Sequence, residues 1–256
     1  MRRIARLLAL KCANHSVSRL GRRAVQESSP ASLLAAIQLA DSFFPSGMYA
    51  HSHGLEGMVN RGLVKSARDV AEFLENQFVW SVMPSDGVSL LEAYRATEKG
   101  CLNIVIAIDE LLLAMKSPSE MRLASTQYGR RVLIETKDWV SHPVRDEFTR
   151  LVVGHTAPGN GAVAMGVTGS ALALGARATL SVYCHSHTVS ILGAAARLLP
   201  FTHTEAQEIL RKLHRLFERL ISEIWDCHWE DMTAYTPELD LVSMGHEHDY
   251  LRMFAS

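Results

Sequence analysis

Residues 204–225 contain the feature that most constrains the fold, a long run with one apolar side. Apolar residues recur at every third or fourth position without interruption: Ile209, Leu210, Leu213, Leu216, Phe217, Leu220, Ile221, Ile224 and Trp225. This spacing matches the turn of an α-helix and not the alternation of a strand. Thr204-Glu-Ala-Gln207 reads as a capping box, so we predict a helix of about 25 residues, about 37 Å long, that begins there and buries this face.

Two further segments have the pattern of a helix start. Ser66-Ala-Arg-Asp69 precedes a run whose apolar residues share one face, Val70, Phe73, Leu74 and Phe78. Ser117-Pro-Ser-Glu120 predicts a second helix, with Ser117 as N-cap and proline at the first helical position, that runs to about Trp139. Alternating apolar runs joined by Asn-Gly or Asp-Gly turns are absent from the sequence. We therefore predict an all-α fold, a single-domain multi-helix bundle over residues 30–236.

The mainly apolar run at residues 162–184 is long enough to cross a bilayer. A transmembrane helix is the alternative here, but Arg177 lies within the run, and a charge in mid-span is costly. Small residues recur through the segment and favour close packing of helices in a soluble core: Gly166, Gly169, Ser170, Ala173 and Gly175.

The composition is that of a globular protein large enough to fold without a structural metal or disulfide. The chain has 256 residues, of which 48% are hydrophobic and 21% are charged. Its four cysteines are scattered, with no Cys-x-x-Cys pair, and no signal peptide is recognisable. These observations predict a cytoplasmic protein with free, mostly buried thiols.

Charge is distributed unevenly along the chain. Residues 1–29 carry a net charge of +6, whereas the remaining residues carry −7. We predict that residues 1–29 form a flexible basic tail, because the segment from Gly21 to Pro30 resembles a flexible joint; a transit peptide is the alternative. The acidic remainder has no basic stripe with interleaved aromatic residues, so nucleic-acid binding is not expected.

Signatures of common enzymes are missing from the sequence. There is no G-x-x-x-x-G-K-[ST] nucleotide loop, no G-x-S-x-G and no H-E-x-x-H. Histidines are numerous, but residues two apart on a helix point away from each other, so His185 and His187 are expected to have core and surface roles rather than to bind a metal. His228 is expected at the C-terminus of the long helix, where a positive charge is favourable.

Two segments remain open on this basis. Pro45-Ser-Gly47 predicts a turn, which places His51, Ser52, His53 and Glu56 on a loop or helix entrance. Their composition favours local caps and surface polar groups, with a metal-ligand set as the alternative. The C-terminal segment, residues 237–256, is acidic at first and ends in apolar residues, so it is either a mobile tail or a docking peptide.

Together these two segments resemble the UreF family of urease accessory proteins. The first matches the family pattern at Leu39, Ala40, Asp41, Ser42, Pro45, Gly47, Ser52, Gly54, Leu55 and Glu56. The second matches it at Pro237, Leu239, Asp240, His246, Glu247, Arg252, Phe254 and Ser256. Between them, the segments Glu120-Met-Arg122-Leu-Ala-Ser125 and Ala195-Ala-Arg197-Leu198 are similar to family motifs, so the resemblance covers residues 33–256.

The resemblance implies an all-helical, dimer-forming protein that catalyses no reaction. Its implied partners are a UreD/UreH-type accessory protein, a UreG-type GTPase and apo-urease, and neither nucleic acid nor a membrane is expected. Nickel would be handled by the complex, with no cofactor stably bound and no metal ligands in this chain. The residues implied in partner binding are Pro45, Gly47, Tyr49, His51, Ser52, Gly54, Glu56, Arg122, Arg197, His246, Glu247, Arg252, Phe254 and Ser256.

Two other functions are consistent with parts of the sequence. A metal-dependent hydrolase would use His246, Glu247, His248 and Asp249, provided that their side chains converge in one pocket. A membrane-associated protein is the second alternative, and it rests on the apolar run at residues 162–184.

Overall fold

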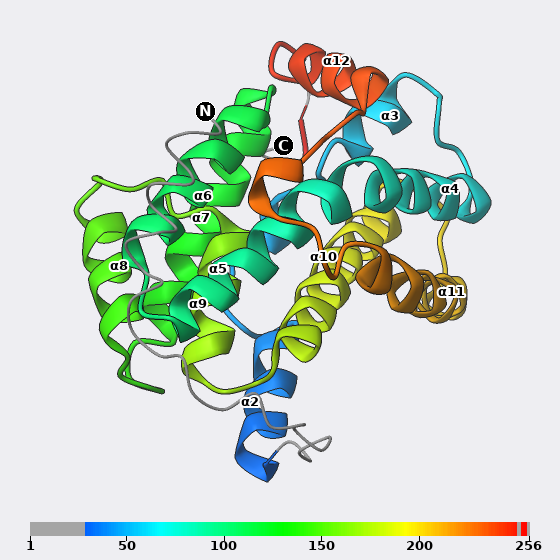
Figure 1. The fold of residues 1–256 in the computed structure, drawn as a ribbon. Coiled ribbons are helices and arrows are strands. Elements are labelled where there is room, and N and C mark those ends of the chain that lie inside the picture. Colours follow the sequence, from blue (N-terminus) through cyan, green and yellow to red (C-terminus); the bar gives the residue numbers. More distant parts are fainter. Residues whose placement is uncertain (1–28, 250–251, 255–256) are drawn as a thin grey trace.

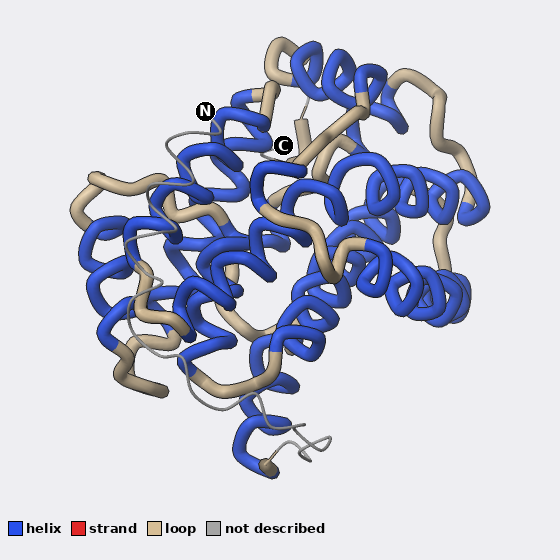
Figure 2. The backbone as a smooth tube through the Cα atoms, viewed as in Figure 1, coloured by secondary structure: helices blue, strands red, loops and turns tan. Residues whose placement is uncertain are grey.

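The computed structural model describes residues 29–249 and 252–254. Over these residues the chain forms helices joined by loops, with no strand (Figure 2), which confirms the predicted all-α fold. Residues 1–28, and with them nearly all of the predicted basic tail, lie outside the described residues.

The helices follow one another along the chain with short connections (Figure 1). The first half contains α2 (Pro30–Ala40), η1 (Met48–Ala50), α3 (Leu55–Asn60), α4 (Ala67–Gln77), the π-helical η2 (Phe78–Gly87), α5 (Val88–Glu98) and α6 (Leu102–Met115). The second half contains α7 (Ser119–Glu135), α8 (Pro143–Val153), α9 (Gly161–Ala171), α10 (Ala176–Leu198), α11 (His203–Glu223), η3 (Trp229–Asp231) and α12 (Pro237–His246).

Helix α9 lies at the centre of the fold and contacts α5, α7 and α10. Nearly all of its side chains are buried. Gly166 lets α9 approach α5 closely, because a Cβ atom there would collide with the carbonyl oxygen of Leu90. The prediction that small residues of this run serve helix packing is confirmed for Gly166 and for Gly169, whose Cβ would collide with Thr179, but it is wrong for Ala173 and Gly175, which are exposed in the loop before α10. Among the described helices, none is long and apolar enough to cross a membrane.

The predicted helix starts are confirmed in part. Ser66 caps α4 and forms a capping box with Asp69. For α11 the predicted start at Thr204 is wrong: the capping box joins Thr202 and Glu205, and the helix ends at Glu223, before His228. The sequence 202–207 contains the Thr-x-x-Glu/Gln pattern twice, and the earlier copy has the charged acceptor, which binds backbone N–H groups more strongly.

Helix α7 begins at Ser119, and Ser117 is not its N-cap. The backbone N–H of Ser119 instead donates to the carboxylate of Glu247, 2.9 Å away, at the end of α12. A carboxylate at a helix N-terminus is stabilised both by free N–H groups and by the helix dipole. The helix ends at Glu135, four residues before the predicted end at Trp139.

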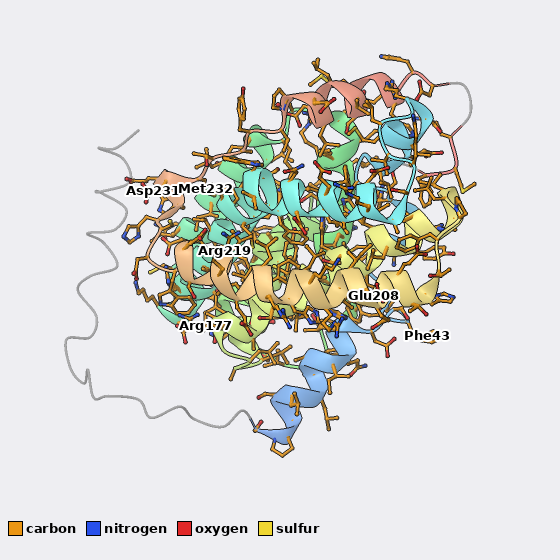
Figure 3. The ribbon with its side chains drawn as sticks, turned by 90° about the vertical axis from the view of Figure 1, so that its right-hand side faces the viewer. Phe43, Arg177, Glu208, Arg219, Asp231 and Met232 are labelled. Carbon is orange, nitrogen blue, oxygen red and sulfur yellow. The ribbon has the colours of Figure 1, made fainter. Side chains whose placement is uncertain are left out.

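Helices α10 and α11 pack antiparallel to each other, with Gly175 at a positive φ of +85° before α10. The apolar face predicted for α11 is buried at Ile209, Leu210, Leu213, Phe217, Leu220 and Ile221. Figure 3 shows α11 lying across the outside of the molecule, with Glu208 and Arg219 labelled along it. This arrangement leaves the polar face of α11 in solvent.

Cysteine chemistry agrees with the prediction at two positions. Cys184 and Cys227 carry free thiols, and burial raises the pKa of both. Cys101 is disulfide-bonded, so the prediction of free thiols is wrong there. The spacing of cysteines excludes local pairs such as Cys-x-x-Cys, but it does not exclude pairing between cysteines far apart in the chain.

Helix α12 packs against α3 on one side of the bundle (Figure 1). The contact is close because two glycines face it. A Cβ atom on Gly57 would lie 2.7 Å from Val242, and one on Gly54 would lie 2.5 Å from Leu239. This contact fixes the position of the chain that follows α12.

We expect Gly54→Ala to destabilise the protein by about 2–4 kcal/mol, because it combines a backbone strain with a clash against α12. Gly54 has a φ of +86°, which alanine adopts poorly, and its Cβ would meet Leu239 and Ser243. Gly62→Ala is the matched control, since Gly62 also has a positive φ, +67°, but would contact only the Lys65 side chain. Urea unfolding measures both; equal losses would show that the contact with α12 contributes nothing.

Candidate partner-docking site

The buried imidazole of His246, at the end of α12, lies between two carboxylates. Its Nδ1 is 2.9 Å from Oε2 of Glu120 on α7, and its Nε2 is 3.0 Å from Oε2 of Glu56 on α3. The His246 side chain is 1% exposed. Each ring nitrogen of His246 is therefore within hydrogen-bond distance of a carboxylate oxygen, and the ring joins α12 to both α3 and α7.

The same two carboxylates also hold the C-terminal segment of the chain. Glu56 accepts hydrogen bonds from the backbone N–H groups of Met253, at 2.7 Å, and Phe254, at 3.0 Å. Glu120 accepts one from the guanidinium of Arg252, at 2.8 Å. Each buried carboxylate is therefore satisfied by His246 and by the C-terminal segment together, as a buried charge requires.

An arginine stacked between two aromatic rings completes the arrangement. The guanidinium carbon of Arg197, on α10, lies 4.1 Å from the centre of the Phe254 ring and 3.9 Å from that of Tyr49. Arg197 also donates a 2.9 Å hydrogen bond to the carbonyl of Tyr49. Phe254 is 4% exposed, whereas Tyr49 is 72% and Met253 is 62% exposed.

We refer to this group as the C-terminal cluster, which comprises Tyr49, Glu56, Glu120, Arg197, His246, Arg252, Met253 and Phe254. It joins residues that are up to 205 positions apart in the sequence, from η1, α3, α7, α10, α12 and the C-terminal segment. Its interior is ionic and fully paired, while its rim presents an aromatic ring and a thioether to solvent. An exposed rim that contains tyrosine, methionine and arginine has residue types that are enriched at protein interfaces.

The loop before α3 lies next to the cluster. Gly47 adopts a φ of +77°, which confirms the predicted turn. His51 is buried, its Nε2 lies 3.3 Å from Oε1 of Gln127, and burial lowers its pKa. The prediction of surface polar groups is wrong for His51 and Glu56, which are buried, whereas the buried Ser52 is a local cap, since its Oγ accepts from the backbone N–H of Glu56 at 3.3 Å. Chain segments distant in sequence, such as α7 and the C-terminal segment, cover them.

His53 and His187 form a pair of neighbouring histidines deeper in the molecule. The rings of His53 and His187 are 4.4 Å apart, and His187 Nε2 lies 3.1 Å from Oε1 of Gln77. Burial lowers the pKa of both rings, that of His187 to about 4. Both are therefore neutral at physiological pH. Both histidines line a small cavity of about 60 Å³, which Asp86 and Lys116 also line.

Acidification should weaken the fold through His187. Its pKa is about 4 when folded and 6.5 at its ordinary value, so below pH 6.5 the unfolded chain binds a proton that the folded chain does not. Stability is therefore lost as the pH falls from 6.5 toward 4, by about 2 kcal/mol between pH 7 and pH 5. Urea unfolding at the two pH values measures this loss. His187→Gln should show a smaller loss; an unchanged loss in that variant would assign the effect to other groups.

The other predicted site residues lie around the cluster or apart from it. Pro45, Gly47, Ser52 and Gly54 shape the loop that leads into α3. Arg122 lies apart, where its guanidinium donates to the carbonyls of Lys116 and Ser117 after α6. Glu247 caps α7, and hydrogen bonding from Ser119 lowers its pKa. Ser256 lies outside the described residues.

Glu120 and Met253 are the members of the cluster that sequence reasoning did not select as site residues, and of the two only Glu120 is buried. It lies within the Glu-x-Arg segment that resembles the family motif, and that segment was the available signal. Its role becomes evident only from its contacts with His246 and Arg252.

The side chains required by the hydrolase alternative do not converge. His246 is buried between carboxylates that face opposite ring nitrogens, whereas Glu247 caps α7 and Asp249 lies 3.5 Å from Arg61. Within the part of the chain that the structure describes, no group of three or more histidine, cysteine or acidic side chains is placed to hold a metal ion.

Comparison with known proteins identifies the family. The family model described as UreF matches residues 64–214, more than half of the chain. The chain belongs to the UreF family. The urease accessory protein UreF of Trichodesmium erythraeum is 31% identical to it over 87% of this chain and 96% of its own length. Those of Paenarthrobacter aurescens and Corynebacterium efficiens are 30% and 27% identical, again over 87% of this chain and over 97% and 96% of their own lengths.

Membership of the UreF family gives the chain a coarse function. It is a urease accessory protein and not an enzyme. The motifs that carried the resemblance in sequence are the segments that meet in the C-terminal cluster: the loop before α3, the start of α7, the end of α10 and the C-terminal segment.

Proposed function

We propose that this UreF-family chain is a non-catalytic scaffold for GTP-dependent nickel insertion into apo-urease. In this role it binds a UreD/UreH-type protein, helps to recruit a UreG-type GTPase to apo-urease and regulates that GTPase. Nickel is the cargo of the assembly, and this chain retains no cofactor. The assembly works in the cytoplasm.

The observation that carries the proposal is the C-terminal cluster with its exposed rim. Glu56 and Glu120 hold the C-terminal segment from inside, while Tyr49, Arg252 and Met253 face solvent beside it. A segment that is already held in place loses less conformational entropy on binding than a free tail does. Partner binding to this rim would therefore be stronger than binding to a mobile peptide of the same sequence.

The rim also has the composition that protein interfaces favour. Tyrosine, methionine and arginine are enriched at protein interfaces. Here Arg252 and Met253 lie within two positions of the buried Phe254, and Tyr49 stacks on Arg197. Arg197 links Tyr49 to Phe254, so the two sides of the rim keep one relative orientation. We therefore propose that the UreD/UreH-type partner contacts this surface.

We also propose that the protein is a homodimer, as the family resemblance implies. The apolar side of α2 supports this proposal, because its residues Leu33, Leu34 and Ile37 are each more than half exposed and could contact a second copy of the chain. Exposed apolar patches of this kind mark association sites. Light scattering coupled to gel filtration measures the oligomeric state directly.

The function is tested by complementation. A host that carries a urease gene cluster without its own UreF is supplied with the full chain, and the nickel content and activity of purified urease are measured. We expect the chain to raise nickel occupancy, and Arg252→Ala combined with Phe254→Ala to abolish the rise. Glu208→Ala, an exposed change on α11, is the control. Equal nickel loading with and without the chain would overturn the proposal.

A further inference from the structure

An open groove with an apolar floor lies between α4 and the segment that leads into α12 (Figure 1). Its volume is about 630 Å³, and none of the residues of the C-terminal cluster lines it. The buried side chains of Val64, Phe73 and Leu239 contribute to its floor. At its rim, Trp80 is 55% exposed and Tyr235 is 73% exposed. Two large aromatic side chains therefore face solvent beside an apolar hollow.

Backbone hydrogen bonds hold the two aromatic residues next to each other. Pro84 lies inside η2 and has no backbone N–H, so it cannot donate to the carbonyl of Trp80, four residues earlier. The N–H of Tyr235 donates to that carbonyl instead, at 2.8 Å, and the N–H of Thr233 donates to the carbonyl of Pro84, at 3.2 Å. This rim is ordered before anything binds, which lowers the entropic cost of binding.

The charged groups that line the groove are all acidic. Asp69, Glu72 and Glu238 line it, and none of the described lining residues is lysine or arginine. Asp69 is already used in the capping box of α4. Glu72 and Glu238 are exposed, and within the described part of the chain neither forms an ion pair. The groove therefore attracts a positively charged occupant and repels a negatively charged one.

This combination of groups matches the chemistry of lysine and arginine side chains. Carboxylates pair with their charge, and the faces of tryptophan and tyrosine attract a cation that lies over the ring. The apolar floor accepts aliphatic side chains, which gain from being removed from water.

We propose that the groove is a docking site for a basic segment of a partner protein, in which lysine or arginine alternates with aliphatic residues. The aliphatic side chains enter the floor, and the cations lie at the rim beside Glu72, Glu238 and the two aromatic rings. The groove lies at the start of α12, whereas the C-terminal cluster holds His246 at its end. This proposal does not rest on the proposed scaffold function, and either can fail without the other.

Calorimetric titration of the full-length chain with a capped twelve-residue peptide that alternates lysine and leucine tests the site. We expect Glu72→Lys combined with Glu238→Lys to weaken binding about tenfold or more, because two attractive charges become repulsive. Glu208→Lys combined with Glu218→Lys is the matched control, since it makes the same change of net charge at exposed positions on α11 and should change the affinity less than about twofold. Equal weakening by both pairs, or no binding to the wild-type chain, would overturn the proposal.

Fluorescence quenching locates the bound peptide. The peptide should shield the exposed indole of Trp80 from acrylamide, and Trp80→Phe should lose this shielding while it keeps an aromatic ring at the rim. Shielding that persists in Trp80→Phe would place the peptide outside the groove and overturn the assignment.

Two other occupants of the groove give different results. If the basic segment of residues 1–28 filled it, Arg2→Glu, Arg3→Glu and Arg6→Glu together would strengthen peptide binding to the full chain. If a second copy of the chain covered it, the peptide would lower the mass measured by light scattering. Either result would overturn the assignment to a partner protein, whereas unchanged affinity and unchanged mass support it.

Discussion

Glu56→Ala is expected to release the C-terminal segment and to lower the free energy of unfolding by about 3–5 kcal/mol. Glu56 is 3% exposed and accepts from His246 and from the backbone N–H groups of Met253 and Phe254. Its removal leaves two backbone donors and one ring nitrogen of the buried His246 without their partner. Truncating one member of a buried ionic group costs more than the group itself contributes, because the charge left behind stays desolvated.

Two measurements check this expectation. Urea unfolding gives the free energy, and amide hydrogen exchange reports whether Met253 and Phe254 lose protection. Glu208→Ala is the matched control, since it removes the same side chain from an exposed position on α11. If Glu56→Ala kept the protection of both amides, the carboxylate would not be what holds the segment.

Asp109→Ala is expected to cost about 3–5 kcal/mol as well, through a different part of the fold. Asp109, on α6, is fully buried and accepts from the backbone N–H groups of Gly159 and Asn160 at 2.7 Å and from the Asn160 side chain at 2.8 Å. Burial raises its pKa, and these hydrogen bonds oppose that rise. They fix the loop that leads into the central helix α9.

This second variant distinguishes global from local loss. Asp109→Ala should shift the urea midpoint while the amides of Met253 and Phe254 keep their protection at low urea, because Asp109 makes no contact with the C-terminal cluster among its described hydrogen bonds. Asp109→Asn keeps the size of the side chain and should lose less. A loss below about 1 kcal/mol for Asp109→Ala would mean that water replaces the carboxylate without penalty.

Sequence periodicity predicted helices such as α4 and α11, each of which buries one continuous face. The register of individual starts was harder to predict, as at Thr202 and Thr204, where two capping patterns overlap and only one is used. The start of α7 was not predictable locally at all, since its cap is the carboxylate of Glu247, from the end of α12.

The cluster could be predicted from sequence only as a set of segments. The family resemblance selected Tyr49, Glu56, Arg197, His246 and Arg252, but nothing in their spacing indicates that they meet. Burial of the loop before α3 was missed because His51 and Glu56 are polar, and polar residues are buried only when distant partners satisfy them. Those partners lie up to 198 positions away in the chain, as the contact between Glu56 and Phe254 illustrates.

The central claim is that the C-terminal cluster forms the docking surface for a UreD/UreH-type partner. It is tested most directly by co-expressing that partner with the full chain and with a chain that ends at Asp249. The shorter chain keeps α12 and His246 but lacks the segment that Glu56 and Glu120 hold. We predict that the full chain captures the partner. The shorter chain should have the circular dichroism spectrum of a folded helical protein and should capture at least tenfold less partner. Equal capture by both chains would contradict the account.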